Sequence, residues 1–352
     1  MSSPLRIGLA GFGYWGSKLA RNVVEAPRCT LAAVCDPAAS RRRAAGAQYA
    51  VPALYETLDE LIGDPQVDAV ILATPAAEHH GQARTALFAG KHVLVEKPLA
   101  LHAAECEELD LIASERALTL MTGHTFLYSA PVRALRSLIG SGELGRILYC
   151  YGQRLNLGAL RSDTSAMWDL APHDVSIVLY LVGHLPLMVS AQQYALLDEP
   201  QEDIAFLSMI FPGGVVGHLH SSRLDPRKVR QLTVVGDRKM AVYDDTDPEL
   251  PLRVYDKGVD VGEELFDAGY GAHRLQVRSG DMVAPRIPGS EPLRVEIEHF
   301  VECAVEGIRP LTDARNGRDV VAVLEAAQRS SVLGGVPTQV ERGSGDAVRA
   351  VA

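Results

Sequence analysis

The sequence predicts an α/β domain at the N-terminus, followed by an α+β domain with a large, mostly antiparallel sheet. Strand-like and helix-like segments alternate up to about residue 122, as they do in parallel sheets covered by helices. From Met188 onward, several strand-like segments follow one another without helices between them, which indicates antiparallel pairing. A chain of 352 residues suits two domains, and we place them at residues 1–122 and 123–340.

The first strand and helix enclose a glycine motif in the stretch LRIGLAGFGYWG, which runs from Leu5 to Gly16. In this G-x-G-x-x-G pattern the first glycine makes a tight turn, the second lets a pyrophosphate approach the backbone, and the third allows close helix–strand packing. The helix N-terminus then offers free N–H groups to phosphates. The motif predicts dinucleotide binding; an ordinary strand–turn–helix connection is the structural alternative. The residues expected at the cofactor are Gly11, Phe12, Gly13, Tyr14, Trp15 and Gly16.

The second strand ends in Asp36, twenty positions after Gly16. An acidic residue at this distance can bind the 2′-hydroxyl of the cofactor ribose, and it would repel the 2′-phosphate of NADP. NAD is therefore favoured. Arg41, Arg42 and Arg43 follow and could accept such a phosphate, so NADP stays open; otherwise these arginines cap a helix and face water.

The remaining elements follow from hydrophobic periodicity and from breakers such as glycine and proline. In the first domain we expect strands over 31–34, 67–73, 92–96 and 118–122, and helices over 38–48, 57–62, 79–89 and 103–114. In the second we expect helices over 130–140, 171–181, 295–305 and 318–331, and strands over 147–157, 188–196, 204–211, 215–220, 231–235 and 240–243. Short turns such as Asp244-Asp245 should separate several of the strands, residues 257–290 resemble a long loop or arm, and the tail after Val340 should be frayed.

Composition excludes several classes of function. The net charge of −10 argues against nucleic-acid and anionic-membrane partners. The five cysteines form no C-x-x-C pair and no metal-ligand motif is present, so we expect buried thiols, a reducing compartment and no metal. No apolar run approaches the roughly 18 residues of a membrane span, and no signal peptide is recognisable. We therefore expect a cytoplasmic protein.

Two more strand ends should lie at the edge of the sheet where the glycine turn lies, because ligands bind at the carboxyl ends of parallel strands. Thr74-Pro75 ends one strand, with His79 opening the next helix, and Glu96-Lys97-Pro98 ends another. The residues added to the expected cofactor site are Thr74, Pro75, His79, Glu96 and Lys97. A lysine facing a nicotinamide ring could exchange a proton with the substrate, whereas the alternative is a surface lysine.

The second domain carries the motif WDLAPHD, with Asp169 as the expected N-cap of a helix and Pro172 in its first turn. Asp169 and His173 are four positions apart, so they share a helix face, and a carboxylate there can orient an imidazole for proton transfer. The alternative is that Asp169 only caps the helix and His173 is a polar surface residue. Asp174 is expected to be solvated or to support this pair.

Candidate substrate-binding residues surround this motif. Arg154 and Asn156 alternate with leucines on a strand and so share one face, which could bind a polyol, and an arginine could hold a carboxylate or phosphate. A solvated sheet face is the alternative. The other candidates are His124, Arg161, His173 and Lys228.

The segments AGFGYWG, ATPAAEHHGQARTALFAGKHVLVEKPLA and DLAPHD together resemble the Gfo/Idh/MocA family, over Leu5 to about Gly334. The resemblance implies a Rossmann domain, a C-terminal sheet through which members often form homodimers or homotetramers, and NAD(P)-dependent chemistry on secondary hydroxyls of sugars or cyclitols. The family's lysine matches Lys97, and its aspartate and histidine match Asp169 and His173.

The segments GHTFLYSAPVRALRSLI and RLNLGALRSDTSAMWDLAPHD most resemble family members that act at the 3-position of nucleotide-linked sugars. Inositol or a free sugar is the alternative substrate. We expect His173 to be the base, oriented by Asp169, with Lys97 at the same substrate oxygen; the reverse assignment of Lys97 and His173 stays open. A dinucleotide-binding sensor without turnover is the alternative of another class, and the presence of all three residues speaks against it.

Overall fold

The computed structural model describes residues 3–158, 164–197, 201–261 and 275–343. The chain divides into two compact units. The first contains Met1–Ser129, Ser290–Glu325 and the chain from Arg342, and the second contains Ala130–Gly289 and Ala326–Glu341. The sequence-based division at residue 122 did not include the return of a C-terminal segment to the first unit.

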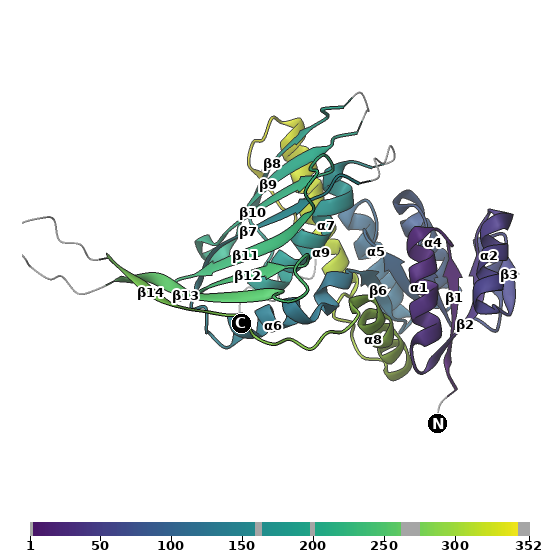
Figure 1. Cartoon of the computed structure of the whole chain (residues 1–352). Helices are drawn as coiled ribbons and strands as arrows, with labels where there is room; N and C mark the ends of the chain where they lie inside the picture. Colours follow the sequence, from purple (N-terminus) through teal and green to yellow (C-terminus); the bar gives the residue numbers. More distant parts are fainter. Residues whose placement is uncertain (1–2, 159–163, 198–200, 262–274, 344–352) are drawn as a thin grey trace, which may run out of the picture. The chain divides into compact units, whose positions relative to one another are not determined.

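The first unit is built on a parallel sheet in the order β3-β2-β1-β4-β5-β6, which confirms the predicted α/β class (Figure 1). Its strands are β1 (Leu5–Ala10), β2 (Cys29–Cys35), β3 (Ala53–Tyr55), β4 (Ala69–Leu72), β5 (His92–Glu96) and β6 (Leu120–Gly123). Its first helices are α1 (Tyr14–Glu25), α2 (Ala39–Tyr49), α3 (Leu58–Gly63), α4 (His79–Phe88) and α5 (Ala103–Glu115), with short turns η1 (Ala76–Glu78) and η2 (Thr125–Tyr128). Among these strands, β3, an edge strand of three residues, was absent from the prediction.

The C-terminal helix α8 (Pro292–Glu306) also belongs to the first unit, where it contacts α1 and η2. Its apolar face, which includes Ile297 and Phe300, joins the core that β1 and α1 form. The sequence predicted this amphipathic helix but not which domain it would cover. The last long helix, α9 (Ala314–Val332), contains the boundary between the two units.

The second unit is built on a nine-stranded sheet in the order β14-β13-β12-β11-β7-β10-β9-β8-β15. Only β7 and β10 pair in parallel; the other neighbours are antiparallel, as predicted (Figure 1). The strands are β7 (Ile147–Leu155), β8 (Met188–Tyr194), β9 (Ile204–Ile210), β10 (Val216–Ser222), β11 (Val229–Gly236), β12 (Met240–Asp244), β13 (Leu252–Val261), β14 (Leu275–Val283) and β15 (Thr338–Gln339). Helix α7 (Ala166–Val182) packs on β7, β9 and β10, α6 (Ala130–Gly140) contacts α7 and β12, and η3 (Pro212–Gly214) joins β9 to β10.

The segment predicted as a long loop or arm contains two strands. β13 begins before it, at Leu252, and pairs antiparallel with β14. Figure 1 shows the two strands continuing beyond the rest of the sheet as an arm. The loop alternative was wrong here because backbone hydrogen bonds form this ladder without the alternating apolar pattern on which strand prediction depends.

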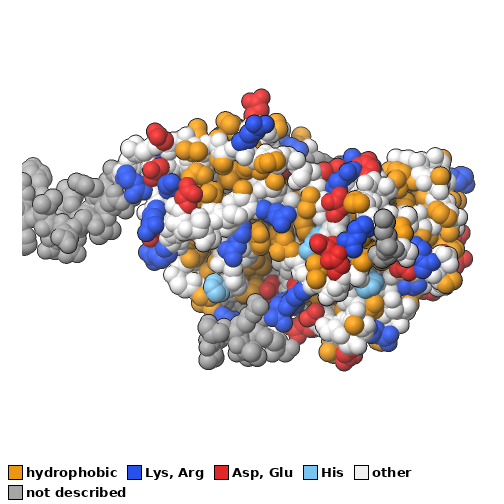
Figure 2. Space-filling view, turned by 90° about the horizontal axis from the view of Figure 1, so that it is seen from below, with side chains coloured by type: hydrophobic (Ala, Val, Ile, Leu, Met, Phe, Trp, Pro, Cys, Tyr) orange, Lys and Arg blue, Asp and Glu red, His pale blue; other side chains and the backbone are white. Residues whose placement is uncertain are grey.

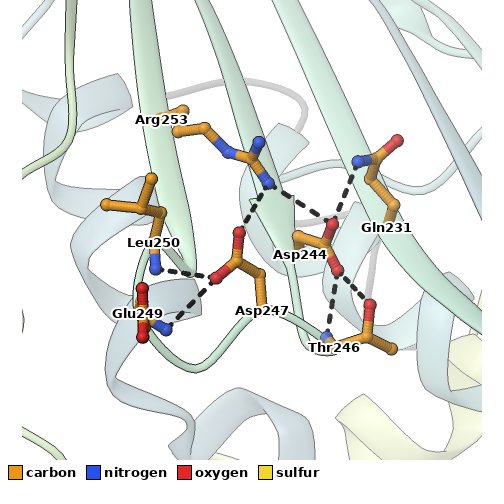
Figure 3. Close-up of polar contacts among 7 residues, drawn as sticks. All are labelled: Gln231, Asp244, Thr246, Asp247, Glu249, Leu250 and Arg253. Atoms are coloured by element: carbon orange, nitrogen blue, oxygen red, sulfur yellow. Dashed lines mark hydrogen bonds and ion pairs between the residues drawn. The ribbon is translucent and has the colours of Figure 1, made fainter.

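The predicted turn at Asp244-Asp245 joins β12 to β13, and side chains hold it in place (Figure 3). Asp244 accepts hydrogen bonds from the backbone N–H and hydroxyl of Thr246, at 3.0 and 2.6 Å, and from Gln231 on β11. Asp247 accepts from the N–H groups of two following residues, Glu249 and Leu250. Arg253 on β13 bridges both carboxylates. Groups from the turn and from the neighbouring strands thus bind both of its carboxylates.

The surface shows no concentration of positive charge on the face drawn in Figure 2, where Lys and Arg side chains lie among Asp and Glu side chains. Among the described residues, no helix is both long and apolar enough to cross a bilayer. All five cysteines are buried free thiols, as expected. In the described part of the chain, no group of three His, Cys, Asp or Glu side chains is placed to bind a metal ion.

Candidate active site

The glycine turn between β1 and α1 has the geometry that its motif predicts. Gly11 has a positive φ of 90°, and a Cβ at this position would lie 2.5 Å from the carbonyl oxygen of Ala73. A Cβ on Gly16 would lie 1.9 Å from the carbonyl oxygen of Gly11, so α1 can approach the turn only with glycine there. A Cβ on Gly13 would meet no atom within 4 Å. The protein therefore leaves space at Gly13 beside the N-terminus of α1, which fits a dinucleotide pyrophosphate.

Asp36 lies at the end of β2, where the ribose-binding carboxylate was expected, but the protein itself uses both of its oxygens. The carboxylate accepts hydrogen bonds from the backbone N–H groups of Phe12 and Ala38, each at 2.8 Å, and its side chain is almost fully buried. It therefore also fixes the glycine turn to β2. The guanidinium of Arg41 lies 3.6 Å away and is mostly exposed, whereas Arg42 is bound to the backbone oxygens of Asp36 and Pro37.

The aromatic residues of the turn have different surroundings. Phe12 is buried, and its ring meets Tyr49 edge-on at 6.2 Å. Tyr14 and Trp15 are exposed at the start of α1, and the Lys18 ammonium lies over both rings at 4.6 and 5.7 Å. The side chain of Phe12 therefore packs in the core, whereas its backbone N–H takes part in the glycine turn by binding Asp36.

His79 connects the ends of two neighbouring strands. Its buried ring lies 2.7 Å from the carbonyl oxygen of Pro98 through Nδ1 and 3.0 Å from that of Thr74 through Nε2. Burial lowers the pKa of His79, although both carbonyl oxygens favour the charged form. Thr74 donates its hydroxyl to Gln82 at 2.6 Å, and Pro75 is exposed just before η1. His79 thus supports the strand ends from within the protein.

Glu96 and Lys97 stand at the carboxyl end of β5, as predicted. Lys97 is half-buried, and its peptide bond to Pro98 is cis. The Glu96 carboxylate turns back to accept the backbone N–H of Lys97 at 3.3 Å. Burial raises the pKa of Glu96 to about 7, against the opposing effect of the Lys97 charge. The strand end therefore carries a carboxyl group that titrates near neutral pH beside the lysine.

His124 follows β6, the next strand of the sheet, and is buried. Its Nδ1 lies 2.7 Å from Oδ1 of Asn316 on α9, so the neutral ring carries its proton on Nδ1. Burial lowers the pKa of His124 to about 4, and the Lys97 charge adds to this. Its Nε2 has no hydrogen-bond partner among the described residues and is available as an acceptor.

In the second unit, α7 begins earlier than predicted and changes the role of Asp169. Ser165 is the N-cap, since its hydroxyl accepts the backbone N–H of Trp168 at 3.3 Å. Asp169 therefore lies inside the first turn, and Pro172 lies within the helix, so the predicted cap was wrong. The carboxylate of Asp169 forms an ion pair with the buried guanidinium of Arg223, at 3.6 Å. His173 lies one turn further on and is half-buried, and the orienting contact between Asp169 and His173 stays a prediction.

Arg154 and Asp174 form a buried ion pair under α7. Two hydrogen bonds of 2.8 Å join the guanidinium to the carboxylate, and both side chains are nearly inaccessible to solvent. Arg154 thus lies on the face of β7 that α7 covers. The prediction that this face is open to substrate or solvent at Arg154 was wrong. The expectation of a solvated Asp174 was wrong, because this carboxylate neutralises a buried arginine.

Two other substrate candidates lie in the second unit. Asn156 is half-buried just after β7, where its N–H donates to the carbonyl oxygen of Ser222. Lys228 is exposed before β11. Arg161 lies outside the described residues.

The structure adds three residues that the sequence reasoning missed: Asn316, Arg223 and Glu296. Asn316 fixes the His124 tautomer, Arg223 pairs with Asp169, and Glu296 is a buried acid on α8. Each is distant in sequence from the group that it contacts, and no motif contains it. Only the tertiary structure reveals these partners.

Comparisons with known proteins agree with this geometry. Residues 5–124 match the model "Oxidoreductase family, NAD-binding Rossmann fold", and residues 132–242 match "GFO/IDH/MocA C-terminal domain". The chain is 30% identical over 320 residues to UDP-N-acetylglucosamine 3-dehydrogenase of Acidithiobacillus ferrooxidans, covering 90% of this chain and 94% of the relative. It is 27% identical over 237 residues to scyllo-inositol 2-dehydrogenase (NAD(+)) of Bacillus subtilis, covering 64% of this chain and 69% of the relative.

Further matches are one relative that is matched over part of its length and two solved structures. An uncharacterized oxidoreductase of Streptococcus pneumoniae is 29% identical over 225 residues, and the match covers 59% of this chain and 59% of the relative. An oxidoreductase domain protein from Kribbella flavida has a TM-score of 0.83 at 22% identity, covering 97% of this chain and 100% of that one. A solved structure of the Acidithiobacillus ferrooxidans enzyme has a TM-score of 0.75 at 27% identity, covering 94% of this chain and 98% of that one. The two matched models and the end-to-end relative show that this chain belongs to the Gfo/Idh/MocA family of oxidoreductases.

Proposed function

We propose that the chain transfers a hydride between NAD and a secondary alcohol of a nucleotide-linked sugar, at the 3-position. The observation that carries this proposal is the end-to-end similarity to UDP-N-acetylglucosamine 3-dehydrogenase, which covers 90% of the chain. The similarity to scyllo-inositol 2-dehydrogenase supports a cyclitol as the alternative substrate.

When bound, the nicotinamide cofactor would supply the hydride chemistry, and the protein would supply binding and proton transfer. The glycine turn and the N-terminus of α1 hold the pyrophosphate in this proposal, and Asp36 and the strand ends at Thr74 and Lys97 flank the rest of the cofactor. Asp36 favours NAD over NADP, because its buried negative charge would repel a 2′-phosphate. The exposed guanidinium of Arg41 beside it keeps NADP as the alternative.

His173 and Lys97 act on the same substrate hydroxyl in this proposal. His173 takes the proton as the hydroxyl is oxidised, and Lys97 stabilises the negative charge that develops on the oxygen. Asp169 orients His173, while Arg223 keeps the Asp169 carboxylate paired. The assignment of base and stabilising cation to His173 and Lys97 can also be reversed.

We also propose that the second unit's sheet joins copies of the chain into a dimer or tetramer. Ile210, Val216 and Tyr149 lie in one row across β9, β10 and β7, each more than 40% exposed. Their neighbours in the strands face α7, so this row lies on the opposite face of the sheet. Light scattering tests the proposal: a mass of two or four chains is expected, and a single-chain mass would contradict it.

To test the function, purified protein is mixed with NAD or NADP and with a UDP-N-acetylhexosamine, an inositol or a free hexose. The absorbance of reduced nicotinamide is then followed. Reduction of NAD by the nucleotide sugar is expected, with a 3-keto product that borodeuteride traps at carbon 3. Faster reduction by inositol or hexose would favour the alternative substrate. Tight cofactor binding without turnover in either direction would indicate a sensor.

A further inference from the structure

The carboxyl group of Glu296 is buried in the first unit, and it forms no ion pair with any residue that the structure describes. Glu296 lies on α8, and its side chain has no exposed surface. One carboxyl oxygen, Oε2, accepts the hydroxyl of Thr125 on η2 at 2.7 Å. The other, Oε1, has no hydrogen-bond partner among the described residues. An ionised carboxylate is costly in such surroundings, whereas a protonated acid needs only an acceptor for its hydroxyl.

The same part of the unit holds Glu96. Gly123 of β6 pairs directly with Glu96 of β5, and a Cβ on Gly123 would lie 3.3 Å from the Glu96 carboxyl oxygen. Two positions later, Thr125 donates to Glu296. The two acids therefore both lie near the end of β6, and the charge on Glu96 adds to the effect of burial in raising the pKa of Glu296 well above its usual value.

We propose that Glu296 is held as a neutral carboxylic acid whose hydroxyl donates to the Glu96 carboxylate, directly or through one buried water, and thereby positions Lys97. Since Thr125 occupies Oε2 as a donor, the proton of Glu296 belongs on Oε1, which has no partner within the described part of the chain. Glu96 in turn accepts the backbone N–H of Lys97. The acid on α8 thus acts through Glu96 on the strand end that carries the proposed catalytic lysine.

Other titratable groups lie near the pair, and several of them have hydrogen-bond partners of their own. Lys97 acts on Glu96 and lowers its pKa, and Tyr128 on η2, which faces Glu296, exchanges a hydrogen bond with Thr312 at 3.1 Å. On α8 itself, His299 accepts the backbone N–H of Leu311, and Cys303 contacts His299. His124 is bound to Asn316 and feels the Lys97 charge. Among the described residues, we therefore take the Glu96 carboxylate as the acceptor for the Glu296 hydroxyl.

The role of Glu296 is that of a positioning residue, and it rests on the proposed function only where Lys97 is concerned. A glutamine at position 296 keeps the shape of the neutral acid and its ability to donate, so Glu296→Gln should retain activity within a few-fold. A leucine keeps the volume and removes the donor. The Glu96 carboxylate then loses stabilisation, and its titration should move upward from near pH 7 by about one pH unit.

The test combines infrared spectroscopy with kinetics on the full chain. At a pH well above the Glu96 pKa of about 7, where Glu96 is ionised, the wild type should show a protonated-carboxyl C=O band, with or without NAD, that is absent in Glu296→Gln. Glu296→Leu should raise the acid-side pKa of the turnover profile and lower turnover at pH 7 at least several-fold. Glu298→Leu, a half-buried position on the same helix, is the matched control and should change neither.

If Glu296→Gln removes no protonated-carboxyl band from the wild-type infrared spectrum, the proposal is overturned. It is also overturned if Glu296→Gln lowers turnover as much as Glu296→Leu does. If Glu296→Leu fails to fold, the wild-type and Glu296→Gln spectra still decide. The spectroscopic result does not depend on turnover. A band without any sugar oxidation would contradict the proposed function alone, and sugar oxidation without the band would contradict this inference alone.

Discussion

Arg154 and Asp174 form a buried ion pair in the second unit. Their paired charges are buried together, so neither can be lost without leaving the other unpaired in a poorly solvated place. Desolvation would lower the pKa of Arg154, yet the ion pair with Asp174 holds it above its usual value. The pair therefore anchors α7, which carries Asp169 and His173, on β7.

We predict that Asp174→Leu destabilises the protein by about 3–5 kcal/mol, because it strands the Arg154 guanidinium. Replacing both partners, with Arg154→Met added, should recover most of that loss. Glu306→Gln breaks the exposed pair with Arg28 and should cost about 1 kcal/mol or less. Urea unfolding measures all three. A double variant less stable than Asp174→Leu would show that the pair is not what anchors α7.

At the scale of elements, the turn between β1 and α1 separates two functions of glycine. Gly16 is required by the protein's own packing, since a Cβ there would collide with the Gly11 carbonyl oxygen. Gly13 is required by nothing within the protein. A glycine without a structural role at the mouth of a helix is what a bound pyrophosphate would need.

We predict that only the Gly16 substitution lowers stability, whereas substitution of either glycine weakens cofactor binding. Gly16→Ala should destabilise the fold by about 1–3 kcal/mol and weaken NAD binding, because α1 must move away from the turn. Gly13→Ala should leave the thermal midpoint unchanged and still weaken NAD binding at least tenfold in a calorimetric titration. Gly63→Ala, where a Cβ also meets no atom within 4 Å, is the control for both measurements. Unchanged NAD affinity in Gly13→Ala would place the pyrophosphate elsewhere.

The sequence was sufficient for elements whose signal is local. The apolar runs of the parallel strands, the glycine turn and the turn at Asp244-Asp245 all stand where the patterns put them. The start of α7 was misplaced because Asp169 and Ser165 are both good caps, and local chemistry does not choose between them. The pairing of Arg154 with Asp174 was missed because a strand residue's alternation does not say which face a helix will cover.

At the scale of the whole molecule, the chain crosses between its two units more than once. The first unit receives Ser290–Glu325 after the larger segment of the second unit, Ala130–Gly289, and α8 then supplies Glu296 to the neighbourhood of β5 and β6. Lys97 belongs to the first unit, and Asp169 and His173 belong to the second. The residues named in the proposed chemistry are therefore distributed over both units.

The central claim is that Lys97 and His173 serve the same chemical step. When two residues serve one chemical step, the effects of their substitutions on turnover are strongly non-additive. Removing the second residue after the first therefore lowers turnover little further. Each of Lys97→Ala and His173→Ala should lower turnover by roughly 10²–10⁴-fold, with NAD affinity changed little, because each removes proton transfer or charge stabilisation at the reacting oxygen. Lys239→Ala, a surface lysine paired with Glu143, should behave as wild type.

The most direct measurement is therefore the double-mutant cycle, with turnover of the sugar substrate determined for the wild type, both single variants and the double variant. A double variant within about tenfold of the slower single variant is the predicted result. A double variant whose loss equals the product of the two single losses would show that the two side chains act independently, and it would contradict the account.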